Sequence, residues 1–101
     1  MIEEHFGNAS MKHEGCSIAR MEAPSGWRGH DQKPEFDEFL MVMKGKMQVK
    51  VDGEKIVVKA GHSILIKRES KVRYSNPFDR HSEYWSICVP PFSLKTVHRK
   101  K

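Results

Sequence analysis

Apolar and polar residues alternate along most of this chain, with the period of two that places successive side chains on opposite faces of a β-strand. The clearest example is the stretch Glu-Phe-Leu-Met-Val-Met-Lys-Gly, which starts at Glu38. Alternating or short apolar segments recur about every ten residues and predict seven strands, over residues 16–21, 39–43, 47–51, 56–58, 64–66, 72–74 and 84–89. No stretch has the period of a convincing amphipathic helix.

Turn residues separate these segments. Asp52-Gly53 is the strongest hairpin signal, because a type I′ turn requires positive φ at both central residues. Pro24-Ser25-Gly26 ends the first strand, and Asn76-Pro77 precedes the last one. Short strands at regular intervals with turns between them predict an all-β sandwich or barrel.

The two ends depart from this pattern. Residues 1–15 mix glycine with scattered charge, which predicts a loose arm or a short edge strand, and residues 93–101 form a basic tail. Residues 27–37 are polar and broken by Gly29 and Pro34, as in a loop or an irregular strand. With 101 residues, the chain is predicted to be a single domain.

The composition limits the class of protein to which this chain can belong. No apolar run approaches the ~20 residues that cross a bilayer, and the start Met1-Ile2-Glu3-Glu4 is acidic where a secretion signal is basic. We therefore expect a cytoplasmic protein without a membrane partner. Cys16 and Cys88 are too few for a disulfide framework and are expected to be free thiols.

The formal charge of +5 raises the question of nucleic acid. The basic residues, however, alternate with apolar ones in residues 46–51, as on the solvent face of a sheet, which argues against a nucleic-acid partner. One compact basic cluster remains, His98-Arg99-Lys100-Lys101, and it carries a nucleic-acid or regulatory hypothesis on charge alone.

Several spacings resemble the cupins, small jelly-roll β-barrels with two sequence motifs. Glu38 and Gly45 have the spacing of glutamate and glycine at the end of the first motif, and Gly61 and Asn76 stand where the second motif begins and ends. The segment between the motifs contains the Asp52-Gly53 hairpin. The resemblance covers residues 26–92 and implies a cupin-type jelly-roll β-barrel.

The same resemblance implies a divalent metal (Mn, Fe, Ni or Zn) held by three histidines and the glutamate. Here Glu38 alone matches. The His-x-His pair falls on Asp31 and Lys33, or on Gln32 and Pro34, and the second-motif histidine falls on Val72.

A displaced metal site remains a hypothesis, because His30 lies one residue from a ligand position and a bulge would turn it inward. Its candidate ligands are His30, Asp31, Gln32 and Glu38. His62 and the other histidines are interpreted as surface residues.

Alternation puts Glu38, Leu40 and Val42 on one face of their strand, which the resemblance points into the barrel. Phe39, Met41 and Met43 then lie outside and need cover, so we expect a homodimer. In the last strand, Tyr84, Ser86 and Cys88 share one face, and Trp85, Ile87 and Val89 share the other.

The predicted pocket holds Glu38, Tyr74 and either Tyr84 or Trp85. The pKa of a buried Glu38 rises unless a cation or metal lies beside it, and Lys33 or Arg73 is the candidate cation. The predicted ligand-binding residues are Glu38, Tyr74, Tyr84 and Lys33; no catalytic residue is identified.

Two functions follow from these residues. The first is a protein that binds a small polar ligand, such as a small acid or a sugar derivative, in its barrel without the standard histidines. The second is a metal-dependent enzyme of dioxygenase or isomerase type that uses the non-standard ligand set.

Overall fold

The computed structural model describes residues 2–7 and 15–98. Within them the chain forms eight strands and one short helix, in the order β1 (Ile2–Phe6), β2 (Ser17–Ala23), β3 (Asp37–Lys44), β4 (Lys46–Val51), β5 (Glu54–Lys59), β6 (Ser63–Ile66), β7 (Val72–Ser75), β8 (Ser82–Val89) and α1 (Leu94–Val97). The predicted all-β class is confirmed, and every predicted strand is present with its ends within two residues of those expected from the sequence.

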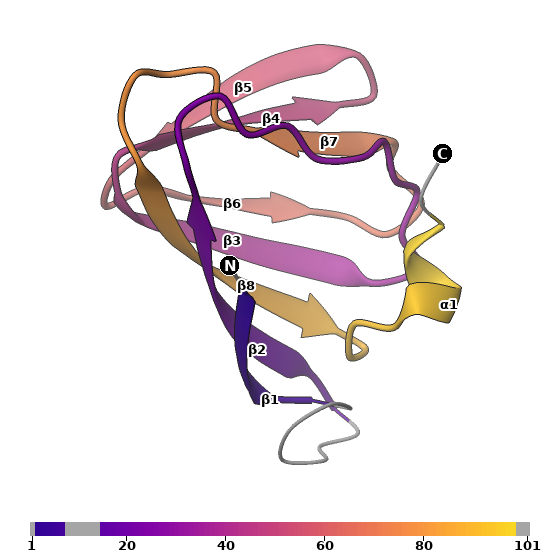
Figure 1. Cartoon of the computed structure of the whole chain (residues 1–101). Coiled ribbons are helices and arrows are strands. Elements are labelled where there is room, and N and C mark those ends of the chain that lie inside the picture. Colours follow the sequence, from indigo (N-terminus) through magenta and orange to yellow (C-terminus); the bar gives the residue numbers. More distant parts are fainter. Residues whose placement is uncertain (1, 8–14, 99–101) are drawn as a thin grey trace.

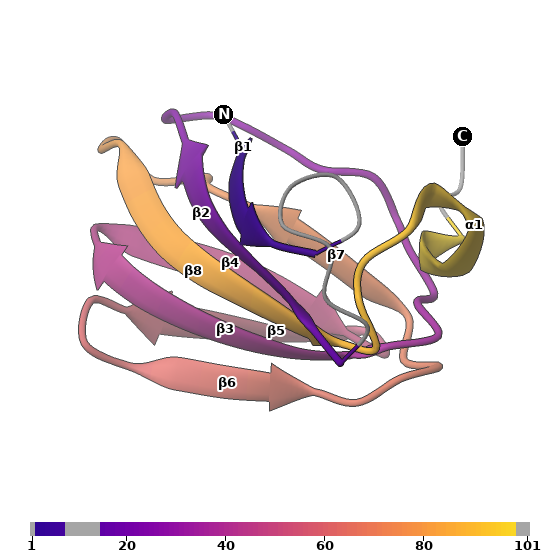
Figure 2. The same cartoon turned by 90° about the horizontal axis from the view of Figure 1, so that it is seen from below.

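The strands form two layers. Five of them make one sheet in the order β1-β2-β8-β3-β6, and three make a second sheet in the order β5-β4-β7. Figure 1 shows the small sheet above the large one, and Figure 2 shows the large sheet from its outer side. All the pairings in both sheets are antiparallel. This is the two-layer arrangement of an open jelly-roll barrel.

The hairpin between β4 and β5 has the predicted turn. Asp52 and Gly53 both adopt positive φ, 47° and 89°, and Val51 pairs with Glu54 across them. A two-residue turn with two positive φ values matches the twist of the flanking strands. It fixes the register of the hairpin, and with it the side chains that share a face.

The space between the sheets is filled by the alternating inward residues. Leu40 and Val42 of β3 pack there against Met47 and Val49 of β4, and all four are buried. Their outward neighbours are exposed, including Phe39 at 42% and Met43 at 54%. The predicted assignment of faces is therefore confirmed for β3.

Gly45 shows why the first motif ends in glycine. It turns the chain between β3 and β4 with φ of +72°, and a Cβ there would lie 2.7 Å from the His81 carbonyl oxygen. Ser82 completes this corner, since its Oγ donates to the Lys46 carbonyl at 2.6 Å and accepts from the Lys46 amide at 3.2 Å.

Asn76 plays the corresponding part in the second motif. Its buried amide donates to the carbonyl oxygens of Ala23 and Arg80 and accepts from the Phe78 amide. These bonds tie the β7–β8 turn to the end of β2. Gly45 and Asn76, the last matched residues of the two motifs, thus hold corners of the barrel.

The first and last described segments both contact the large sheet. Of the alternatives for residues 1–15, an edge strand forms over Ile2–Phe6; residues 8–14 lie outside the described residues. The predicted tail contains α1, whose Val97 packs with Phe36, Cys88 and Phe92 at one end of the barrel. Residues 99–101, most of the basic cluster, are also outside the described residues.

Between β2 and β3 the chain runs beside β7 (Figure 1). It touches β7 through isolated bridges from Arg28 to Ser75 and from Gln32 to Val72, as an irregular strand does. Over the described ranges, no helix has the length and apolar character needed to span a membrane.

Candidate functional site

Glu38 lies in the interior, between the two sheets. It is carried by the inward face of β3, opposite Cys88 on β8, and is 7% exposed. Its carboxylate accepts a hydrogen bond from the Tyr74 hydroxyl at 2.7 Å and another from the Ser86 hydroxyl at 2.6 Å. Because Ser86 belongs to the same sheet and Tyr74 to the facing one, Glu38 links the two layers.

Burial dominates the electrostatics of this group. Loss of solvation raises the pKa of Glu38, although the hydrogen bonds from Ser86 and Tyr74 lower it in part. Burial and the nearby Glu38 charge also raise the pKa values of Tyr74 and Tyr84, and they raise that of Cys88 to about 12. The two phenols and the thiol are therefore neutral hydrogen-bonding groups at physiological pH.

A cavity of about 250 Å³ opens next to these groups. Its walls come from the large sheet, from Tyr74 of the small sheet and from the segment between β2 and β3. The lining residues are Ile2, Glu4, Ser17, Ala19, Met21, Trp27, Gly29, His30, Gln32, Phe36, Glu38, Tyr74, Tyr84, Ser86, Cys88 and Phe92. Among the residues that the structure describes, the lining includes five aromatic rings other than histidine and two carboxylates, but neither a lysine nor an arginine.

Three of the four predicted ligand-binding residues lie together in this cavity: Glu38, Tyr74 and Tyr84. The alternative Trp85 lies on the outer face of β8, where its ring is 5.0 Å from that of His5. Lys33 is elsewhere, in a second cavity. Neither Lys33 nor Arg73 is beside Glu38, and the predicted rise of the Glu38 pKa is confirmed.

The predicted metal ligands are divided between two sites. His30, Gln32 and Glu38 line the first cavity, whereas Asp31 accepts a hydrogen bond of 2.8 Å from Arg73 in the second. No group of three or more His, Cys, Asp or Glu side chains in the described ranges is arranged to hold a metal ion. The residues present thus do not fit the three-histidine set of the resemblance, and the displaced site stays a prediction.

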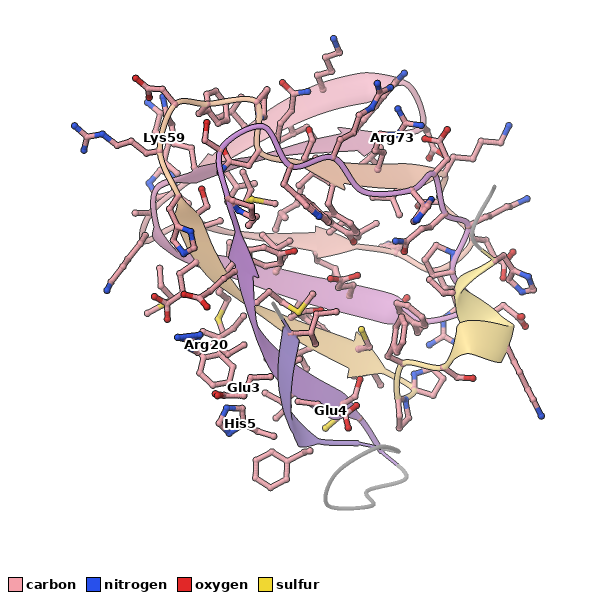
Figure 3. All side chains as sticks on the ribbon, in the orientation of Figure 1. Glu3, Glu4, His5, Arg20, Lys59 and Arg73 are labelled. Atoms are coloured by element: carbon pink, nitrogen blue, oxygen red, sulfur yellow. The ribbon has the colours of Figure 1, made fainter. Side chains whose placement is uncertain are left out.

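Sequence reasoning missed Glu4 as a cavity residue. Figure 3 shows Glu4 on the opposite side of β1 from Glu3 and His5, which lie near Arg20 on the outer side. The alternation in Glu3-Glu4-His5 is a signal for opposite faces, but no sequence feature determines the register of β1 against β2. That register pairs Glu4 with Ala19, another cavity residue.

A second cavity of about 350 Å³ has the opposite charge. It lies at the end of the small sheet near the turn of the β4–β5 hairpin. Its lining residues are Asp31, Gln32, Lys33, Lys50, Gly53, Lys71, Val72, Arg73 and His98. Lysine and arginine thus supply four positive charges there against one carboxylate, while His98 pairs with Glu35.

Comparisons with solved structures support the fold. The DMSP lyase DddQ from Ruegeria pomeroyi DSS-3 superposes with a TM-score of 0.81 and 11% identity, over 96% of this chain and 49% of that one. An RmlC-like cupin family protein with a double-stranded β-helix fold from Methanocaldococcus jannaschii gives a TM-score of 0.77 and 19% identity, over 89% and 79%. At these identities the likeness concerns the fold alone.

A curated relative is closer in sequence. The endoribonuclease YbeY of Myxococcus xanthus (strain DK1622) is 38% identical over 97 residues, which are 96% of this chain. The chain spans about a third (33%) of the length of that protein.

The cupin domain model matches residues 19–89, from β2 to the end of β8. This range contains both resembling motifs and the Glu38, Tyr74 and Ser86 cluster. The chain belongs to the cupin domain family.

Proposed function

We propose that the Glu38 cavity binds a small ligand that is neutral or cationic and rich in hydrogen-bond donors. The observation that carries this proposal is a buried carboxylate whose two hydrogen bonds both come from hydroxyl groups, at the wall of a 250 Å³ cavity. Each carboxylate oxygen can accept two hydrogen bonds, so each oxygen of Glu38 has capacity for one more donor.

Charge selects the class of ligand. Among the described residues, Glu4 adds a second carboxylate to the cavity, and neither lysine nor arginine lines it. A carboxylic acid would place another acidic group beside the buried Glu38 carboxyl, which is costly where solvent is excluded. Of the two ligand types expected from the sequence, a sugar derivative or another polyol therefore fits better than a small acid.

Size and aromatic lining agree with this choice. A cavity of 250 Å³ lies below the ~300–1,000 Å³ of typical drug-sized sites, which favours a small molecule. Trp27, Phe36, Tyr74 and Tyr84 line the cavity. Aromatic rings suit the apolar side of a sugar or an alkylammonium group.

Thermal-shift measurements test this function with four sets of compounds: monosaccharides and polyols, primary amines, carboxylic acids, and divalent metal ions. A member of the first two sets is expected to raise the Tm of the wild type, and the shift should fall by at least half in Ser86→Ala. Ser63→Ala, an exposed serine on β6, is the matched control. Stabilisation by acids alone would contradict the proposed ligand class.

The metal arm tests the enzyme alternative. A shift with Mn, Fe, Ni or Zn that disappears in both His30→Ala and Glu38→Gln would favour the metal-dependent enzyme over the metal-free binding protein. Metal analysis of untagged protein would check the same point, because a resident ion must then be present in stoichiometric amount.

A second candidate function comes from the Myxococcus relative. Almost the whole of this chain resembles a third of an endoribonuclease, so we propose that the chain acts in RNA metabolism, as a module that binds RNA. Salt-dependent binding of single-stranded RNA by the purified chain tests this function. An absence of binding at low salt would contradict it.

We also propose that two copies of the chain pair through the outer face of the large sheet. Directly opposed residues form an apolar row across all five strands: Phe6, Ile18, Ile87, Phe39 and Leu65. The four strand spacings of about 4.8 Å make it about 19 Å wide. An exposed apolar row of this width needs a partner, and a second copy offers an identical row.

A further inference from the structure

The outer face of the small sheet carries cations opposite one another. Lys46 pairs with Lys59 across β4 and β5, and Lys50 pairs with Lys55 on one side and with Arg73 of β7 on the other. Their neighbours Met47 and Val49 point into the core, so these five side chains share the outward face. Figure 3 shows Lys59 and Arg73 towards opposite ends of this sheet.

These charges are poorly neutralised. Within the described residues, no ion pair involves Lys50, Lys55 or Lys59, and Arg73 pairs with Asp31 alone. Like charges directly opposite each other destabilise a sheet. The requirements of folding alone therefore do not account for two such rows.

The row formed by Lys55, Lys50 and Arg73 continues into the basic cavity of about 350 Å³. There Lys33 and Lys71 lie with Lys50 and Arg73. A concave surface of one charge sign concentrates the field and attracts ions of the opposite sign. The cavity is therefore the strongest part of a larger cationic surface.

We propose that this surface, the basic sheet face of Lys46, Lys50, Lys55, Lys59 and Arg73 with the adjoining cavity, binds the phosphate backbone of single-stranded RNA. This rests on the second proposed function and names the surface that performs it. It departs from the expectation that no nucleic acid binds, because the strand register sets these cations opposite one another. The two cation rows lie four residues apart, about 13 Å along the strands. That distance exceeds one phosphate group and suits a chain of phosphates lying across the sheet.

One aromatic contact favours single strands over a duplex. The Lys46 ammonium lies 4.5 Å from the centroid of the Phe78 ring, at the edge of the basic face. Surfaces for single-stranded nucleic acid combine cations for the backbone with aromatic rings on which unpaired bases stack. Bases in a duplex are not available for such stacking.

The test compares two double charge reversals with the same change in net charge. Lys50→Glu/Lys55→Glu alters the basic face, and Lys67→Glu/Lys95→Glu alters exposed lysines after β6 and on α1. Both variants keep residues 98–101, so any contribution of the basic tail cancels. Circular dichroism and Tm confirm that each variant folds.

Binding of a fluorescent single-stranded RNA of ~12 nucleotides is followed by anisotropy between ~50 and ~200 mM salt. The face variant is expected to bind at least ten times more weakly than wild type, and the control less than three times. Loss of two phosphate contacts should also reduce the slope of log K against log salt by about 1.4.

The outcomes separate the two proposals. If the wild type does not bind RNA, the RNA function fails and the basic face with it. Equal weakening in both variants would overturn the face alone, because binding would then follow net charge. Tripolyphosphate competing as well as RNA at equal phosphate concentration, or tighter binding to phosphatidylglycerol vesicles, would overturn RNA as the occupant.

Discussion

The outer faces of the two sheets differ in how they carry charge. On the large sheet, Glu83 lies directly opposite Lys44 on β3 and Glu22 on β2, and Arg20 forms ion pairs with both carboxylates, at 3.0 Å to Glu83 and 3.6 Å to Glu22, so each like charge there has a cation beside it. On the small sheet, Lys46 faces Lys59, and Lys50 lies between two other cations. Both faces belong to one small domain and have the same antiparallel geometry.

The net charge of +5 is therefore unevenly distributed over the molecule. Opposite charges across a strand pair stabilise by about 0.2–1 kcal/mol, and like charges destabilise. On the large sheet, oppositely charged side chains pair beside the apolar row. On the small sheet, cations lie opposite cations. We interpret the first as a surface for a second copy and the second as a surface for a polyanion.

Phe39→Glu should have the largest effect, since it places a charge at the centre of the apolar row. If each copy loses a contact of about 2 kcal/mol, the dissociation constant of the dimer rises by about 1,000-fold. Light scattering or analytical ultracentrifugation at micromolar concentration would then show a monomer that remains folded.

Val57→Glu is the matched control for the comparison of faces. Val57 is exposed to a similar extent, 46% against 42% for Phe39, but lies on the small sheet. The variant should keep the oligomeric state of the wild type. A wild type that is already monomeric would mean that the apolar row has no self-association, and the interpretation of this face would fail.

Glu38→Gln should change the pH dependence of stability, because this carboxyl is enclosed between the two sheets. Burial raises its folded-state pKa above its value in the unfolded chain. As pH rises, the unfolded chain ionises first, so the wild type loses stability relative to Glu38→Gln until the pH exceeds the folded-state pKa. The loss is about 1.4 kcal/mol for each pH unit between the two pKa values.

Chemical denaturation at several pH values measures this difference. The exposed Glu54→Gln variant serves as a control for the loss of one carboxylate at the surface. The pH effect at Glu38 should persist at high salt, since salt screens buried charges far less than surface charges. A constant difference between wild type and Glu38→Gln from pH 4 to 9 would contradict a buried, ionisable Glu38.

The interior could largely be predicted from sequence, because it depends on local alternation. The period of two along β3 places Leu40 on the inward face, as observed; along β8 it groups Tyr84 with Ser86, and the structure shows that this is the inward face of that strand. The spacing of the two cupin-like motifs then predicts that the strands form a barrel. Burial of Glu38 follows from the same alternation once the barrel is assigned.

The position of Lys33 could not be predicted in this way. It lies in the irregular segment that touches β7 at Arg28 and Gln32, where a shift of one residue moves a side chain to the other face. The charge rows could be predicted in part, because a two-residue turn at Asp52-Gly53 places Lys50 opposite Lys55. The pairing of Lys50 with Arg73 could not be predicted, because β7 pairs with β4 only after an intervening hairpin and crossover.

Lys50→Glu should stabilise the isolated protein, although it replaces a residue of a proposed binding surface. The substitution turns two like-charge pairs, with Lys55 and Arg73, into two opposite-charge pairs, and we expect a gain of about 1 kcal/mol at low salt. Urea denaturation measures it, and 1 M salt should remove most of it. Destabilisation at low salt would show that the cations do not repel each other.

Glu83→Gln on the other face should have the smallest effect and the opposite sign. It keeps the size of the side chain but removes the charge that pairs with Arg20 and Lys44; the Arg20 partner is 27% exposed, and the loss is partly offset because Glu22, directly opposite, no longer faces a like charge. A loss of about 0.5 kcal/mol at low salt is expected, because partly exposed pairs contribute little. At 1 M salt, the loss of stability in Glu83→Gln and the gain in Lys50→Glu should both become smaller. If both substitutions shifted stability in the same direction, the two faces would not differ in charge balance, and the contrast that assigns them different partners would be lost.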